Sequence, residues 1–203
     1  MKSTTLLFLA MIAAQPLLGL TPPLPSAEFV AGAIEKFSTR GHAKAKGVVF
    51  TMAYPKSWKA TEGERPDTIQ KFASDSGKGL EEVLILTKEL PADRTVTPQR
   101  IEEILSPAGL KEHLPDGATF IRTNTTIIGN EPVGILYYSL GQKKKDGSKH
   151  DTHSVICMFV QGRTLVQIQF HIVGSSYSPS ETRVPYYLPL WDLMMRSIVF
   201  SDK

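Results

Sequence analysis

The chain has 203 residues, of which 41% are apolar and 21% are charged, and its formal net charge is +3. This size and composition are typical of one globular domain that buries a sufficient core without metal ions or disulfides. The near-neutral charge argues against a general nucleic-acid-binding protein, because such proteins concentrate Lys and Arg on one face.

The start of the chain predicts export from the cytosol. Residues 1–19 have the pattern of a secretory signal peptide: Lys2 supplies a positive charge, residues 6–14 form an apolar run, and Gly19 follows as a small residue. The run is shorter than the ~20 apolar residues that span a bilayer. We therefore expect a cleaved signal peptide and a protein that works in the periplasm or is secreted.

The chain has one cysteine, Cys157, so an internal disulfide is excluded. This residue lies in the apolar stretch 155–160 and not at the end of the signal peptide, where a lipoprotein anchor requires a cysteine. We expect Cys157 to be a small core residue of a buried strand, and the exported protein to have no membrane anchor.

Residues 20–46 are predicted to precede the compact domain. Three prolines within residues 21–26 predict an extended leader, and Ser26 can cap a helix. The residues that recur at helical spacing after this cap are Phe29, Val30, Ala33, Ile34 and Phe37. The basic stretch 40–47 predicts a flexible connector, and the domain is assigned to residues 47–203.

Apolar runs and alternating patterns predict a domain rich in strands. The predicted strands cover residues 48–53, a short stretch from Trp58, and residues 68–73, 83–86, 120–128, 133–140, 155–160 and 166–172. In the last of these strands, one face carries Val166, Ile168, Phe170 and Ile172, and the other carries Gln167, Gln169 and His171.

Two further helical regions are predicted. Thr97 is a plausible cap for a helix that begins at Pro98, and the inner face of this helix is Ile101, Ile104 and Leu105. Near the C-terminus, Pro185 and Pro189 argue against one long helix from Ser180. We expect a shorter helix that begins at Pro189.

The order and spacing of these elements resemble the PsbP-like superfamily, which includes PsbP and exported bacterial domains of the DcrB and LpqN type. The residues that carry the resemblance are Tyr54-Pro55-Lys56-Ser57-Trp58, Leu84-Ile85-Leu86 before Pro98, Gly134-Ile135-Leu136-Tyr137-Tyr138 before Asp146-Gly147, and Arg196-Ser197-Ile198-Val199-Phe200. The resemblance covers residues 47–200 and implies an α/β/α sandwich with a central, mainly antiparallel sheet. It also implies binding or assembly in place of catalysis, with the bacterial periplasm as the setting.

A basic cluster surrounds a predicted hairpin turn at Asp146-Gly147 and consists of Lys143, Lys144, Lys145, Lys149 and His150. A two-residue turn would place Lys144 opposite Lys149 and Lys143 opposite His150. Because like charges opposite one another destabilise a hairpin, the cluster is a candidate contact for an acidic partner. The alternative is a soluble edge that deters strand pairing.

Two other groups of residues suggest ligands. His150, Asp151 and His153 have metal-binding side chains, but His150 and His153 point to opposite faces of a regular strand. The aromatic residues near the last helix, Tyr177, Tyr186, Tyr187 and Trp191, are consistent with a ligand groove or with a cover for the end of the sheet.

No nucleophile elbow or phosphate loop is present in the sequence. We therefore predict an exported, non-catalytic binding or assembly module that recognises a protein partner through its basic hairpin and needs no cofactor or metal. The alternative is a periplasmic carrier of a small ligand or a metal ion.

Overall fold

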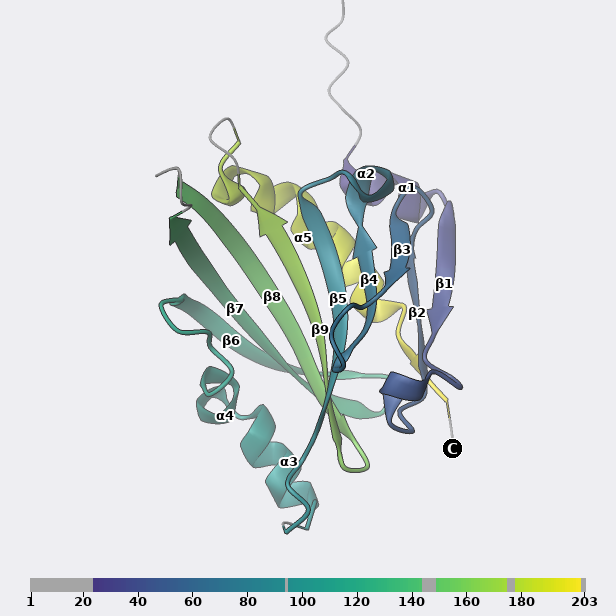
Figure 1. Cartoon of the computed structure of the whole chain (residues 1–203), viewed down its shortest axis with the longest axis vertical. Helices are drawn as coiled ribbons and strands as arrows, with labels where there is room; N and C mark the ends of the chain where they lie inside the picture. Colours follow the sequence, from purple (N-terminus) through teal and green to yellow (C-terminus); the bar gives the residue numbers. More distant parts are fainter. Residues whose placement is uncertain (1–23, 94, 144–148, 175–177, 202–203) are drawn as a thin grey trace, which may run out of the picture.

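The computed structural model describes residues 24–93, 95–143, 149–174 and 178–201, and a twisted antiparallel sheet dominates it (Figure 1). The strands of this large sheet, in spatial order, are β3 (Lys59–Glu62), β4 (Thr68–Ala73), β5 (Glu81–Glu89), β9 (Thr164–Val173), β8 (Lys149–Gln161), β7 (Glu131–Lys143) and β6 (Thr119–Ile128). A smaller sheet has the order β1 (Ile34–Ser38), β2 (Phe50–Pro55) and β10 (Val199–Phe200).

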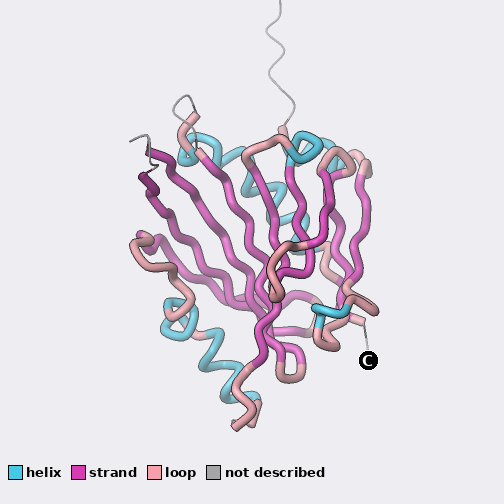
Figure 2. Tube along the Cα trace, in the orientation of Figure 1, coloured by secondary structure: helices cyan, strands magenta, loops and turns pink. Residues whose placement is uncertain are grey.

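Helices lie on both faces of the large sheet (Figures 1 and 2). One layer contains α3 (Pro98–Leu105) and α4 (Pro107–Lys111), and the opposite layer contains α5 (Ser180–Arg196) beside the smaller sheet. The remaining elements of the described residues are the short α1 (Pro25–Val30), η1 (Ala43–Ala45) and α2 (Ser74–Gly77). The predicted α/β/α sandwich with a central antiparallel sheet is confirmed. None of the described helices is long and apolar enough to cross a membrane.

Side chains alternate between the two faces of β9, and its apolar face lies in the larger of two cores. Val166, Ile168, Phe170 and Ile172 are fully buried against α5 and the smaller sheet, as predicted. The indole of Trp191 stacks on the ring of Phe170 with 5.6 Å between the ring centroids and 3° between the ring planes. Cys157 lies in the same core, and burial raises the pKa of its thiol to about 12, so its predicted role as a small core residue is confirmed.

The second core lies under α3 and α4. Ile104 and Leu105 of α3 and Leu110 of α4 pack on Leu136 of β7 and Ile156 of β8. The Thr97 hydroxyl accepts a hydrogen bond from the backbone N–H of Arg100, so the predicted cap of α3 is confirmed. This core covers parts of β7 and β8 and reaches Leu165 of β9.

The predicted helix through Phe37 is wrong. Helix α1 ends at Val30, Gly32 has a φ of 78°, and residues 34–38 form β1, which pairs with β2 from Ile34–Pro55 to Ser38–Thr51. The helical spacing of the apolar residues gave the wrong element because Phe37 packs against the main core as part of strand β1. Residues 34–38, which were assigned to the segment before the domain, thus pair with β2, the first strand of the predicted domain.

The expectation that Pro185 and Pro189 prevent one long helix is also wrong, since both lie inside α5. The two prolines are four residues apart, so they share one helical face, and that face is exposed. Water can solvate the carbonyl groups that lose their helical partners there. Burial of Leu190, Trp191 and Met194 on the opposite face offsets the cost of the two prolines.

Candidate functional site

The predicted basic cluster lies at the far end of the β7–β8 hairpin. Lys143 pairs with Lys149, and Gln142 pairs with His150, so the predicted register is off by one residue. The predicted turn at Asp146-Gly147 lies outside the described residues. Lys144 and Lys145 lie outside the described residues. The register therefore brings two lysine positions, 143 and 149, directly opposite one another.

The end of this hairpin projects from the sheet as a two-stranded arm (Figure 1). Pairing of β7 with β6 reaches only Ser139, and pairing of β8 with β9 begins at Thr152. Residues 141–143 and 149–151 therefore pair only with each other among the described strands, and we call them the basic arm.

The base of the basic arm is held by the start of α5. The carboxylate of Asp151 accepts hydrogen bonds from the backbone N–H of Ser180, at 2.9 Å, and from its hydroxyl. Because the hydroxyl hydrogen is directed to Asp151, Ser180 Oγ accepts from Nδ1 of His153, at 2.7 Å. Burial alone would raise the pKa of Asp151, but the hydrogen bonds from Ser180 outweigh it and lower that pKa.

This cluster contains Asp, Ser and His in an order unlike that of a hydrolase. In a catalytic triad the histidine lies between the acid and the serine and removes the serine proton. Here the buried Ser180 lies between Asp151 and His153, and its proton goes to the carboxylate. The arrangement anchors a helix to a strand and activates no nucleophile.

The two histidines proposed as metal ligands point apart. Pairing of β8 with β7 is continuous from Lys149 to Met158, so successive side chains alternate between faces. His150 Nδ1 is 3.0 Å from the carbonyl oxygen of Gly174, and His153 contacts Ser180. Within the described ranges, no group of three or more His, Cys, Asp or Glu residues is arranged to hold a metal ion.

The aromatic residues near α5 divide between core and surface. Trp191 is buried, Tyr187 packs on the core beside Phe170, and Tyr186 is exposed, while Tyr177 lies outside the described residues. Tyr187 also contacts the guanidinium of Arg183, which forms an ion pair with the buried carboxylate of Glu81. Trp191 and Tyr187 therefore serve chiefly as packing for α5 on the sheet.

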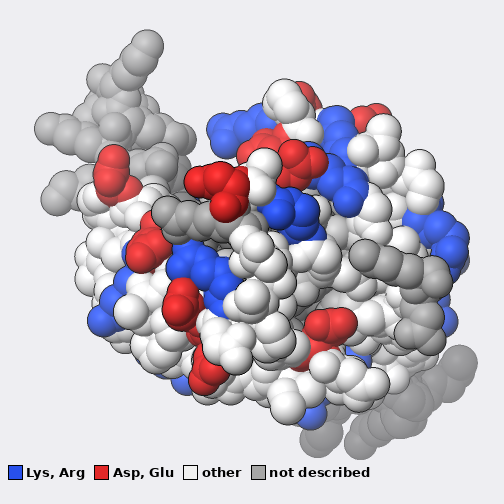
Figure 3. All heavy atoms as spheres, turned by 90° about the horizontal axis from the view of Figure 1, so that it is seen from below, with Lys and Arg blue, Asp and Glu red and all other residues white. Residues whose placement is uncertain are grey.

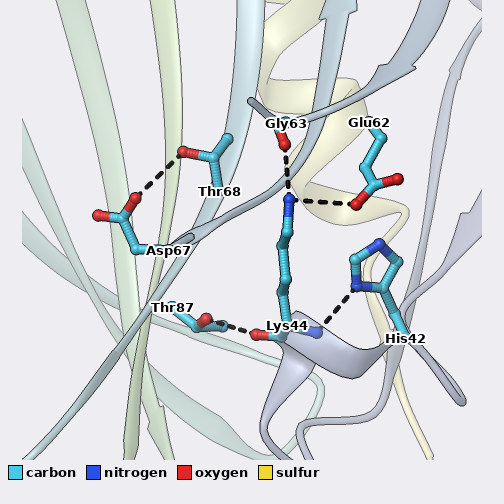
Figure 4. A network of polar contacts seen from close by, with 7 residues as sticks. All are labelled: His42, Lys44, Glu62, Gly63, Asp67, Thr68 and Thr87. Carbon is cyan, nitrogen blue, oxygen red and sulfur yellow. Dashed lines mark hydrogen bonds and ion pairs between the residues drawn. The ribbon is translucent and has the colours of Figure 1, made fainter. Parts of the chain in front are cut away.

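The predicted flexible connector is an ordered element. In Figure 4, the ammonium group of Lys44 in η1 donates to the carbonyl oxygen of Gly63, at 2.6 Å, and lies 3.1 Å from a carboxylate oxygen of Glu62. The hydroxyl of Thr87 donates to the carbonyl oxygen of Lys44, at 2.7 Å. Lys44 therefore joins η1 to the β3–β4 connection and to β5, and the expectation of flexibility is corrected.

A row of polar side chains crosses the sheet face on the side of α4. Ser154 Oγ lies 2.8 Å from His171 Nδ1, and His171 Nε2 lies 3.2 Å from Gln169 Oε1. The amide of Gln169 then donates to Gln167, whose own amide lies 3.3 Å from Nδ1 of His113. When both histidines are neutral and carry the proton on Nε2, each group in the row can donate a hydrogen bond to the next, from Ser154 to His113. Burial lowers the pKa of His113 and of His171, which favours this neutral state.

An apolar pocket of about 880 Å³ lies between α3 and the β6–β7 edge, and no pattern in the sequence predicts it. Its lining includes Val96, Ile101, Leu105, Thr125, Thr126 and Pro132. The volume lies in the range of small-molecule and side-chain binding pockets, roughly 300–1,000 Å³. The inner face of α3 was predicted, but the pocket depends on how far α3 stands from β6, which no local pattern encodes.

Several solved structures have a similar fold at low sequence identity. The cyanobacterial PsbP of Synechocystis is 14% identical over 83% of this chain and 93% of its own, with a TM-score of 0.52. LpqN of Mycobacterium tuberculosis, described as involved in cell envelope biogenesis, is 11% identical over 90% of this chain and 100% of its own, with a TM-score of 0.53. The chain has the PsbP-like fold. No protein-family model matches the sequence, and no curated protein matches it.

These likenesses confirm the fold expected from the resemblance. At such low identities they establish the architecture alone, because one scaffold serves unrelated functions. The function must therefore be argued from this chain's own surfaces. On the face seen from below in Figure 3, basic and acidic side chains are interspersed with wide uncharged areas.

Proposed function

We propose that this protein is an exported, non-catalytic binding or assembly module that recognises an acidic protein partner through the basic arm and its connecting residues. The observation that carries the proposal is the register, which places Lys143 opposite Lys149 at the end of a projecting hairpin. Like charges at paired positions cost stability unless a partner neutralises them. Lys144 and Lys145, which lie between these two lysines in the sequence, add to the positive charge, and His150 follows Lys149.

The firm base of the arm supports the same role. Asp151 is fixed to Ser180, and Gly174 donates its backbone N–H to the carbonyl oxygen of Asp151 at 2.7 Å. An arm held in this way loses little conformational entropy when a partner binds it. The apolar run of residues 6–14 supports export, and the Asp151–Ser180–His153 order supports a role other than hydrolysis.

Affinity capture from a cell-envelope extract tests the proposal. The immobilised chain should enrich a partner, and a Lys143→Glu/Lys144→Glu/Lys145→Glu variant should lose it. A matched control, Lys36→Glu/Lys56→Glu/Lys59→Glu, makes the same charge change at three exposed lysines elsewhere and should retain the partner. A partner retained by the arm variant would exclude the arm, and no enriched protein in any sample would refute the binding function.

A further inference from the structure

The two edge strands of the large sheet differ in how they are protected against further pairing. Strand β3 has four residues and carries Lys59 and Glu62 at its ends, and short, charged edges deter strand addition. Strand β6 has ten residues, and Arg122 is its single charged residue. One edge of the sheet is therefore blunted, and the other is open.

The open edge is regular over most of its length. A bulge between Phe120 and Arg122 interrupts its pairing with β7, and the register is continuous from Arg122–Tyr137 to Ile128–Glu131. Among the strands that the structure describes, β7 is the only one that pairs with β6. Ile127, at 71% exposure, is one of the most exposed large apolar residues in the described part of the chain. The segment 122–128 thus presents an unpaired backbone edge with an apolar side chain beside it.

The apolar pocket lies beside this edge. Thr125 and Thr126 of β6 form one wall, and Ile101 and Leu105 of α3 form the other. A strand added to β6 sends every second side chain to the α3 side of the sheet, where the pocket lies. Backbone hydrogen bonds would supply affinity, and the pocket would supply selectivity for apolar side chains.

Cations flank the other end of β6 on both faces of the sheet. The ammonium group of Lys111 lies 4.4 Å from the ring centroid of Phe120, and the guanidinium of Arg122 lies 4.0 Å from that of Tyr137. Phe120 pairs with Tyr138, whereas Arg122 pairs with Tyr137, so the two cations belong to opposite faces. A carboxylate in an added strand would meet positive charge here on either face.

We propose that β6 accepts an extended segment of the partner protein as an additional strand, with apolar side chains in the pocket and carboxylates beside Lys111 and Arg122. This inference rests on the proposed binding function and names the partner's chemistry: an extended peptide that is apolar at one end and acidic at the other. A second copy of this chain fits less well, because its own β6 supplies Arg122 and no carboxylate.

Selection of linear peptides on the full chain provides the test. Peptides from a random display library should be enriched in β-branched and acidic residues, and their binding should protect the backbone amides of residues 119–128 from hydrogen exchange. Ile127→Lys and Arg122→Glu should each weaken binding roughly tenfold or more. The matched control is Val30→Lys, at a position that is 73% exposed on α1, and it should bind as the unmodified chain does.

Several results would overturn the inference. The inference fails if no peptide is selected, or if protection from hydrogen exchange maps outside residues 119–128. It also fails if Ile127→Lys and Val30→Lys weaken peptide binding equally, or if an apolar small molecule fills the pocket while no peptide binds. A concentration-dependent dimer that Ile127→Lys abolishes would identify a second copy as the occupant and overturn it as well. If envelope capture depends on the basic arm while Ile127→Lys has no effect, the proposed function stands and strand addition fails.

Discussion

Gly134→Ala should lower the free energy of unfolding when Leu110 is present and raise it when Leu110 is replaced by alanine. A Cβ atom at Gly134 would lie 2.6 Å and 3.0 Å from the two methyl carbons of Leu110. Leu110 is fully buried where α4 contacts β7, so its side chain can move away only by displacing packed neighbours. Helix α4 therefore approaches the sheet at a residue that has no side chain.

The magnitudes follow from packing. Overpacking by one methyl group costs about 1–3 kcal/mol, and the reduced entropy of the unfolded chain returns about 0.4–1 kcal/mol, so Gly134→Ala should lower the free energy of unfolding. Leu110→Ala should cost about 2–5 kcal/mol, because it leaves a cavity. In the double variant the alanine methyl at position 134 partly fills that cavity, so Gly134→Ala should there raise the free energy of unfolding by up to about 1 kcal/mol.

Urea unfolding, followed by the fluorescence of the buried Trp58 and Trp191, measures all four members of this cycle. Gly141→Ala is the control on the same strand, since a Cβ there meets nothing within 4 Å, and it should raise the free energy of unfolding by about 0.4–1 kcal/mol whether or not Leu110 is shortened. Effects of Gly134→Ala and Leu110→Ala that add to within about 0.5 kcal/mol would refute the packing argument.

Three further predictions concern stability. The pKa values of His113 and His171 are lowered in the folded state, so the unfolded chain binds more protons than the folded chain as the pH falls below about 6.5. The free energy of unfolding should therefore decrease over this pH range. In urea titrations, His113→Gln/His171→Gln should flatten the dependence of the free energy of unfolding on pH, and an unchanged slope would count against the role of these histidines. Glu81→Gln should cost up to about 3–5 kcal/mol because it leaves the partly buried Arg183 without its counter-charge, whereas Glu81→Leu/Arg183→Met should cost less in the same assay. Thr97→Ala should lower the free energy of unfolding by about 1 kcal/mol through loss of the α3 cap, and a loss just as large in Thr97→Ser would show that the hydroxyl is not its source.

The elements that were predicted correctly are those whose signals are local. The alternation along β9 follows from a side-chain period of two, and the start of α3 follows from a capping hydroxyl and a proline in the first turn. The errors came where distant contacts outweighed local preference. Ile34 and Phe37 have helical spacing but pair with β2, and α5 tolerates Pro185 because its opposite face is buried.

The candidate site also combines features with local signals, which were predicted, and features that depend on distant contacts, which were not. Lysines around a turn predicted a basic hairpin, but the register at Lys143 depends on pairing along the whole of β7 and β8. The pocket beside β6 could not be predicted, since its walls come from α3 and from strands that follow it in the chain. Ser180 was missed as the anchor of the arm because it lies 29 residues after Asp151.

The sequence by itself determined the strand-rich class, the two faces of β9 and the concentration of lysines at one hairpin, because each depends on neighbouring residues and on periodicity. Only the tertiary structure decided which edge of the sheet stays open, where the pocket forms and how the arm is held. These features depend on strand order and on the separation of packed layers. Both are set by contacts between residues far apart in the chain, such as Leu110 against Gly134 and Asp151 against Ser180.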